Sequence, residues 1–252
     1  MINNKVYLFL ALIYAVTQGV RAQFPNPFLS EKALPDGTQW LPKPPSITSG
    51  EFYNDLYFYQ WGKDMRNGET GEKALWDESA ELYQVFTEAM GITLSYKSTP
   101  EILFLAEAAT SDANASSKAL KNYYERLRPF VTLNEPSLKP EEDEKKYNSF
   151  CYPSGHAARG WMFALVLATI APERTEALMS RAYEYALNRV ICGHHWKSDI
   201  DAALMLTAGL FANVVATESY QQQLVKAKAE YALVKEQPIS MPFVYSKIDS
   251  IP

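Results

Sequence analysis

A nearly unbroken apolar segment, Ser154 to Ile170, limits the fold of this chain more than any other feature of its sequence. Trp161, Met162, Phe163 and their neighbours leave it without a polar stripe, which is typical of a helix buried on all sides. Such a helix needs other apolar elements packed around it. A hydrophobic content of 47% is sufficient for one packed core of this kind.

Amphipathic patterns on both sides of this segment supply the partners. We expect helices over Glu51–Asn67, Gly71–Met90, Pro100–Ala115, Ser116–Leu127, Pro172–Val190 and, with a break near Ser219, from Trp196 to about Lys235. Phe130 to Ser149 is expected to be a loop whose acidic stretch, Glu141 to Lys146, faces solvent. No strand-like run, glycine-rich phosphate loop or internal repeat occurs in the sequence. We therefore predict an all-α, single-domain helical bundle over residues 50–236.

The N-terminus carries a targeting signal. Lys5 precedes an apolar run from Val6 to Val16, and Val20-Arg21-Ala22 forms a small-x-small cleavage site, which is the layout of a secretory signal peptide over residues 1–22. The run is short for a bilayer span, so an uncleaved anchor is the weaker alternative. We expect a periplasmic or secreted protein with no stable membrane span after signal removal.

Two proline-rich segments flank the bundle, an extended arm over residues 23–49 and a tail over residues 237–252. Segments of this kind can lie across a partner subunit, so a homo-oligomer stays open. The two cysteines, Cys151 and Cys192, allow one disulfide in an exported protein. Two buried free thiols are the alternative.

All three histidines lie in two short stretches of the chain. In the first stretch, Ser154-Gly155-His156 opens the apolar helix. Serine is a common helix N-cap, glycine lets the backbone approach a ligand, and the free N–H groups of a helix N-terminus attract anions. Capping alone would explain Ser154, but His156 adds a titratable group at the same helix mouth.

The second stretch holds Arg189, His194, His195 and Asp199. His195 and Asp199 are four residues apart, so on a helix they share a face. The carboxylate would hold the Nδ1 proton of His195 and leave Nε2 free as a base or nucleophile. A surface His–Asp pair is the alternative for this stretch alone. His194 is expected mainly to pack beside His195.

A third stretch carries Lys121 and Arg128, which precedes Pro129. Lys121 and Arg128 are seven residues apart, two helical turns, so we expect both to point the same way. Arg126 is then expected to face elsewhere. Basic residues on a helix usually contact solvent, so this pair alone does not define a site.

Together, the three stretches resemble the type 2 phosphatidic acid phosphatase (PAP2) superfamily, which also contains the vanadium haloperoxidases. Its pattern is Lys-x6-Arg-Pro, then Pro-Ser-Gly-His, then Ser-Arg-x5-His-x3-Asp. The matching positions are Lys121, Arg128, Pro129, Pro153, Ser154, Gly155, His156, Arg189, His195 and Asp199. Asn188 stands where the pattern has serine, and we expect little effect because asparagine also forms hydrogen bonds. The run from Val190 to Asp199 is similar to the bacterial class A non-specific acid phosphatases in particular.

This resemblance implies an acid phosphatase that hydrolyses phosphate monoesters with broad specificity, such as nucleotides and sugar phosphates, and that can also transfer phosphate to alcohols. His195 would be the nucleophile of a phosphohistidine intermediate, Asp199 would orient it, and His156 would be the general acid and base. The phosphate would be held by Lys121, Arg128, Ser154, Gly155 and Arg189. With these cations no metal or other cofactor is required, and vanadate can serve as a phosphate mimic. A neutral His195 beside a charged His156 would favour acidic pH.

Other functions use parts of the same pattern. A vanadate-dependent haloperoxidase would use the same residues, and a non-catalytic phosphate-binding protein would explain the cations but not the His–Asp pair. A zinc site of His194, His195 and Asp199 would leave those cations unexplained. A membrane lipid phosphatase would need several spanning helices. The net charge of -5 argues against nucleic-acid binding.

Overall fold

The computed structural model describes residues 25–237 and 239. The signal peptide expected at residues 1–22 and most of the expected tail, residues 237–252, lie outside this part of the chain. The described residues form ten α-helices and three 3-10 turns, with no strand among them. The predicted all-α class is confirmed.

The α-helices differ greatly in length, from the short α6 to the long α5. In order they are α2 (Phe52–Asp64), α3 (Glu69–Ser79), α4 (Leu82–Met90), α5 (Pro100–Tyr124), α6 (Pro129–Leu133), α7 (Pro140–Lys146), α8 (Gly155–Ile170), α9 (Thr175–Ile191), α10 (Lys197–Val215) and α11 (Glu218–Val234). The 3-10 turns are η1 (Glu31–Ala33), η2 (Gly37–Gln39) and η3 (Pro172–Arg174).

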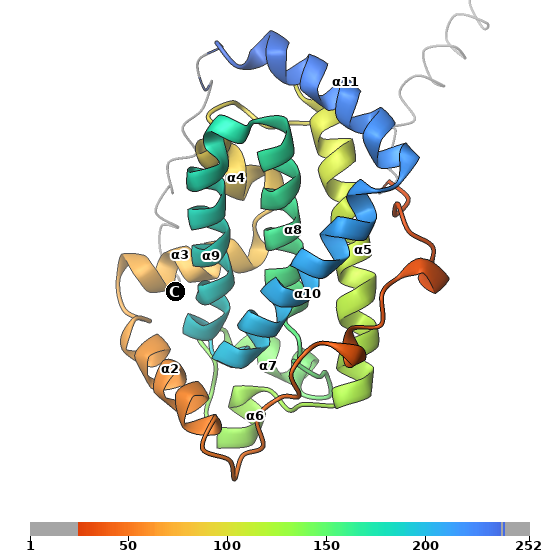
Figure 1. The fold of residues 1–252 in the computed structure, drawn as a ribbon. Coiled ribbons are helices and arrows are strands. Elements are labelled where there is room, and N and C mark those ends of the chain that lie inside the picture. Colours follow the sequence, from red (N-terminus) through yellow and green to blue (C-terminus); the bar gives the residue numbers. More distant parts are fainter. Residues whose placement is uncertain (1–24, 238, 240–252) are drawn as a thin grey trace, which may run out of the picture.

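The apolar helix α8 lies in the middle of the bundle, packed most extensively on α5 and α9 and also on α10 (Figure 1). The Ser154 hydroxyl caps it by accepting a hydrogen bond from the Ala157 N–H. Gly160 permits the close approach of α9, since a Cβ there would lie 2.4 Å from the Tyr185 ring. The expectation of a buried central helix is therefore met.

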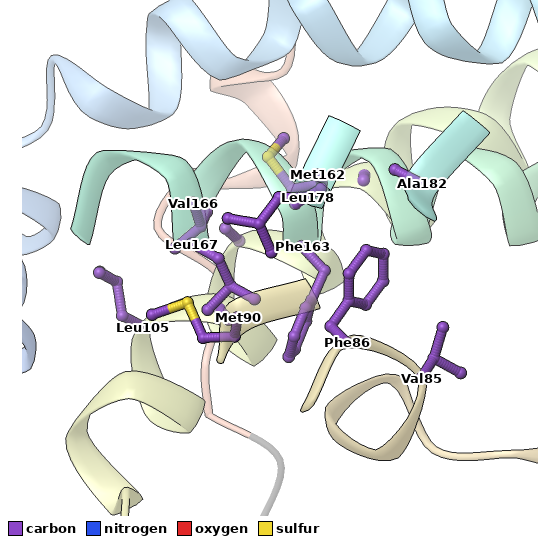
Figure 2. Close-up of a cluster of buried hydrophobic side chains, with 14 of the residues drawn as sticks. Val85, Phe86, Met90, Leu105, Met162, Phe163, Val166, Leu167, Leu178 and Ala182 are labelled. Atoms are coloured by element: carbon purple, nitrogen blue, oxygen red, sulfur yellow. The ribbon is translucent and has the colours of Figure 1, made fainter. Parts of the chain in front are cut away.

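The main core joins α4, α5, α8 and α9, and Figure 2 shows part of it. Phe86 of α4 stacks on Phe163 of α8 with ring centroids 5.4 Å apart. Met90, Leu105 and Leu167 fill the space beside them and are fully buried. Burying each such side chain contributes about 1.5–3 kcal/mol, so this core holds the four helices in fixed positions.

Two of the expected helix boundaries are wrong. The segment predicted as one helix, Gly71–Met90, is divided because Ala80 is extended (φ -73°, ψ 148°) and Glu81 with Gln84 forms a capping box that starts α4. Conversely, α5 runs without a break through Ala115 and Ser116. Here α5 packs extensively on α8, with the Ser117 hydroxyl next to Gly155, and that packing favours one continuous helix.

The predicted loop between Phe130 and Ser149 contains two short helices, α6 and α7. Each has a proline at its first position, Pro129 or Pro140, where the missing N–H costs nothing. In α7 the acidic residues occupy the first turn and the lysines the last, an order that the helix dipole favours. Further on, the expected break near Ser219 occurs at Ala216–Thr217, where the Thr217 side chain caps α11.

The described part of the proline-rich arm runs along α5 and α10 (Figure 1). The backbone N–H groups of Phe28 and Leu29 donate to the buried Asp112 carboxylate of α5. Farther along, Trp40 packs against Gly209 of α10, where a Cβ would meet the indole at 2.6 Å. The arm thus covers one side of the bundle.

Within the described residues, α10 is the one helix long and apolar enough to cross a bilayer. It packs on α5, α8 and α9, and its first turn carries the buried Asp199. These contacts are those of a core helix.

Candidate active site

The three motif-bearing stretches meet at one end of the bundle. The C-terminal ends of α5 and α9, the N-terminal ends of α8 and α10, and the short helix α6 converge there (Figure 1). Lys121 lies near the end of α5 and Arg189 near the end of α9, Arg128 directly precedes α6, and the segments 154–156 and 195–199 contain the starts of α8 and α10. Residues up to 78 positions apart in sequence therefore surround one point.

Backbone hydrogen bonds tie these stretches together. The Ser154 N–H donates to the Asp199 carbonyl at 3.0 Å, and the Cys151 N–H donates to the Arg126 carbonyl at 2.9 Å. The Trp196 indole N–H donates to the Leu127 carbonyl at 3.0 Å. The mutual positions of the motifs are thus set by the backbone and by one buried aromatic ring.

His195 has the geometry of a nucleophile. Its Nδ1 lies 3.1 Å from Oδ2 of the fully buried Asp199, and its Nε2 lies 3.3 Å from Nη1 of Arg128. Burial, together with Arg128, Lys121 and the other nearby cations, holds the pKa of His195 well below its usual value. The imidazole is therefore neutral near pH 6.5, with an Nε2 lone pair directed at the cations.

The His195–Asp199 contact does not arise as the sequence suggested. α10 begins at Lys197, so His195 precedes the helix and does not share its face. Asp199, in the first turn, reaches back to accept from the Trp196 N–H at 2.9 Å and to meet His195. The predicted pair is present. It forms because Asp199 reaches back from the first turn of α10, and not because both residues lie on one face of a helix.

Arg126 belongs to the site, and the expectation that it faces elsewhere is wrong. Its Nη1 donates to Asp199 Oδ1 at 2.6 Å and its Nη2 to Asp55 Oδ2 at 2.6 Å. α5 ends at Tyr124, and Glu125 adopts a left-handed conformation (φ 49°), so helical phase no longer applies beyond it. Arg126 and Asp55 thus hold the carboxylate that orients His195.

Lys121 and Gly155 form one wall of the site. A Cβ at Gly155 would lie 3.4 Å from the Lys121 Nζ and 3.1 Å from the Ser117 hydroxyl, so glycine keeps this wall open. Burial and the nearby Arg128 lower the pKa of Lys121 to about 8. The fully buried Ser154 hydroxyl accepts from the Ala157 N–H, which leaves its own proton available to an anion.

Arg189 is buried with most of its hydrogen-bonding capacity unused. Its Nη2 lies 3.0 Å from His194 Nδ1 and 3.4 Å from Glu78 Oε1, but its Nε and Nη1 have no partner. Buried donors are normally satisfied, and a planar fork of this kind fits the oxygens of phosphate. The chemistry of the donor set is that of an oxyanion site.

The pKa of Lys121 predicts how anion binding depends on pH. Tungstate is a dianion at and above neutral pH, and its affinity should begin to fall as pH rises through about 8, because Lys121 loses its charge there. Lys121→Gln should bind tungstate about tenfold more weakly and with little pH dependence in that range. Titration calorimetry measures both quantities. The same alkaline loss in the variant would assign it to another group.

His156 lies at the mouth of α8, partly exposed, with its ring stacked on Tyr185 at 4.4 Å. Its Nε2 lies 3.1 Å from the backbone carbonyl of Asp77, which can only accept, so Nε2 carries the proton and Nδ1 is the titrating nitrogen. Burial, Arg189 and Arg159 hold the pKa of His156 well below its usual value. The unliganded protein therefore disfavours the charged His156 expected from the sequence.

His194 does more than pack beside His195. Its fully buried ring has Nδ1 3.3 Å from Glu78 and Nε2 3.4 Å from Asp143. Burial opposes ionisation of Glu78, but His194, Arg189 and Lys146 hold its pKa well below the usual value. The acidic stretch expected to face solvent thus contributes Asp143 and Lys146 to a cluster behind Arg189.

Two further sequence expectations are decided by the structure. Asn188, which replaces the serine of the pattern, is buried and donates to Asp77 Oδ2 at 2.7 Å, so it does form a hydrogen bond. Cys151 and Cys192 are both buried free thiols, so the alternative of a disulfide is not realised.

Known proteins are similar to this chain over most of its length. A profile of the PAP2 superfamily matches residues 102–223. A non-specific acid phosphatase of Providencia stuartii is 37% identical over 213 residues, covering 83% of this chain and 86% of that protein. The chain belongs to the PAP2 superfamily, in its class A non-specific acid phosphatase branch. A non-specific acid phosphatase of Salmonella typhimurium is 31% identical over 234 residues (91% and 93% of the two chains), and an acid phosphatase of Zymomonas mobilis is 26% identical over 240 residues (90% of each).

The segment matched by the PAP2 profile contains every predicted site residue, but three of the carboxylates that support them lie outside it. Asp55, Asp77 and Glu78 come from α2 and α3, outside residues 102–223. Acidic residues on amphipathic helices carry no signal that separates them from surface charges, so sequence reasoning missed all three. In the described part of this PAP2 protein, no three His, Cys, Asp or Glu side chains gather as metal ligands.

Proposed function

We propose that the protein hydrolyses phosphate monoesters through a phosphohistidine intermediate on His195. One observation carries the proposal: Nε2 of His195 lies 3.3 Å from Arg128 Nη1, and Arg189, whose charge also acts on His195, keeps its Nε and Nη1 without a partner. A tetrahedral anion in contact with these donors would present its phosphorus to Nε2. A phosphate-binding protein would need the cations alone, whereas the His195–Asp199 pair supports nucleophilic attack.

In the first half-reaction, Nε2 of His195 attacks phosphorus and the bond from phosphorus to the ester oxygen breaks. The electron pair of that bond goes to the leaving oxygen, which takes a proton from His156. Lys121, Arg128 and Arg189 neutralise the charge on the three equatorial oxygens, and the Asp199 carboxylate stabilises the positive ring of phosphorylated His195.

In the second half-reaction, the now neutral His156 takes a proton from water, and the resulting hydroxide attacks phosphorus. The bond between phosphorus and His195 Nε2 breaks, its electron pair returns to the ring, and inorganic phosphate leaves. An alcohol in place of water would give phosphate transfer to that alcohol by the same steps.

The low pKa of unliganded His156 agrees with operation at acidic pH. A neutral His156 with a phosphate ester monoanion contains the same number of protons as a charged His156 with the dianion. Below the second pKa of the ester, the substrate can therefore bring the proton that His156 must donate. The proposal includes broad specificity for nucleotides and sugar phosphates, and export to the periplasm or medium.

The test is hydrolysis of p-nitrophenyl phosphate in excess EDTA. We expect activity on the acidic side of neutrality, undiminished by the chelator. A labelled substrate quenched in alkaline denaturant, in which phosphohistidine survives, should leave label on the wild-type protein and none on His195→Ala. Bromide oxidation with vanadate and peroxide, without ester hydrolysis, would instead support the haloperoxidase alternative.

A further inference from the structure

A groove of about 760 Å³ opens beside the site, between the arm, α5 and α8. Six of its lining residues define its chemistry: Glu31, Leu34, Asn114, Lys118, Asn122 and Arg159. No aromatic ring lines it and its side chains are mostly polar, so it offers no stacking surface to a planar base.

The groove begins about one helical turn, roughly 5.4 Å, from the phosphate-holding residues. On α8, Arg159 is one turn beyond Gly155, and on α5, Lys118 is one turn before Lys121. The two helices approach each other where Gly155 of α8 faces Ser117 and Lys121 of α5. Arg159 is also close enough to His156 to lower its pKa. The separation is short enough for the alcohol portion of a phosphate ester held at His195 to reach the groove.

Two cations in the groove lack partners. Neither Lys118 nor Arg159 forms an ion pair with any other described residue, and Arg159 is the one Lys, Arg, Asp or Glu on α8. Arg159 is half-buried in the wall of the groove, so its guanidinium is available to an anion that enters there. Glu31 is the one carboxylate among the lining residues, and it is solvent-exposed.

We propose that this groove binds a second oxyanion on the alcohol portion of the substrate, with Arg159 and Lys118 as its ligands. The preferred substrates are then monoesters that also carry a carboxylate or a second phosphate. The inference rests on the proposed function and deepens it, because it assigns a specificity to the groove that the catalytic residues do not provide.

The general positive field of the site also attracts anions, so the test compares matched substrates. For the carboxylate, the pair is 3-phosphoglycerate and glycerol 3-phosphate. For the second phosphate, the pair is 1,3-propanediol bisphosphate and 3-hydroxypropyl phosphate. We expect the wild-type protein to favour the more anionic member by about tenfold in kcat/KM, mainly through KM, and less at high salt.

Arg159→Gln and Lys118→Gln should each reduce this ratio several-fold, whereas Lys226→Gln, an exposed lysine on α11 far along the chain from the groove, should leave it unchanged. Loss of Arg159 also removes a charge near His156, but that acts equally on both members of a pair and cancels in the ratio. If only one pair responds, the groove is selective for that oxyanion. An unchanged ratio in Arg159→Gln and Lys118→Gln, or no preference in the wild type, would overturn the proposal.

A binding measurement separates this proposal from the proposed function. The same ligand pairs are titrated calorimetrically into His195→Ala, with and without Arg159→Gln, where no turnover is needed. Tighter binding of the more anionic ligand that disappears with Arg159→Gln supports the groove even if the wild type hydrolyses no ester. Equal affinity for both members of each pair would reject the groove even if hydrolysis is fast.

Discussion

His195→Ala is expected to lower kcat for p-nitrophenyl phosphate by at least about 10⁴-fold while inorganic phosphate still binds. The substitution removes the nitrogen that we propose as the nucleophile, but leaves Lys121, Arg128 and Arg189 as the proposed ligands of the anion. Steady-state kinetics measures the first effect, and calorimetry with phosphate measures the second. Added imidazole should restore part of the activity, because it can enter the space left by the ring.

Arg128→Ala is the comparison for this experiment. Arg128 contacts His195 Nε2 and the His194 carbonyl, so its loss should weaken phosphate binding and turnover together. A different pattern would change the mechanism. Near-normal turnover in His195→Ala would show that another group attacks phosphorus. Weaker phosphate binding with an unchanged kcat would show that the imidazole is a ligand and not a nucleophile.

Arg126→Leu should produce the largest loss of stability among the charged residues of the site. Arg126 is 8% exposed and bridges Asp55 and Asp199, which are 1% and 0% exposed. Removing one partner leaves two carboxylates buried without a counterion, which costs about 3–5 kcal/mol. That corresponds to a fall in Tm of roughly 10 °C in a chain of this size, measured by calorimetry or circular dichroism.

The control is Lys63→Ala, which removes an ion pair of similar length, 2.7 Å to Glu135, on the surface of α2. Solvent screens that pair, so its loss should change Tm far less. The double variant Asp55→Asn with Arg126→Leu should recover part of the lost stability, because it removes one of the stranded charges. Equal Tm values for Arg126→Leu and Lys63→Ala would show that the buried network adds nothing to stability.

The sequence was a reliable guide wherever one local pattern was enough. The apolar run from Ser154 to Ile170 predicted the central helix, and the motifs predicted Lys121, Arg128, Arg189, His195 and the other motif residues that now meet at the site. They did not predict Arg126, which also belongs to it. The helical geometry used to predict the contacts was less reliable than the choice of residues. Lys121 and Arg128 converge although Arg128 lies beyond the end of α5, and His195 meets Asp199 although it precedes α10.

Two of the errors at the site share one physical cause. Arg126 was assigned to the wrong direction because a helix was extended past Glu125, whose left-handed conformation ends it. Glu141 to Lys146 was assigned to solvent because charged residues usually are, yet Lys146 pairs with Glu78 at 2.5 Å. Both assignments depend on contacts between segments distant in sequence, which no local pattern contains.

The sequence by itself therefore determined the helical class, the buried central helix and the motif residues that meet at the candidate site. Only the tertiary structure decided how those groups are supported: Asp55 and Arg126 behind Asp199, Glu78 and Lys146 behind Arg189, and two free thiols in place of a bridge. Motif residues can be identified from their residue type and spacing within one short stretch of sequence. Supporting residues are specified by burial and by the partner that burial brings near, and both exist only once the chain has folded.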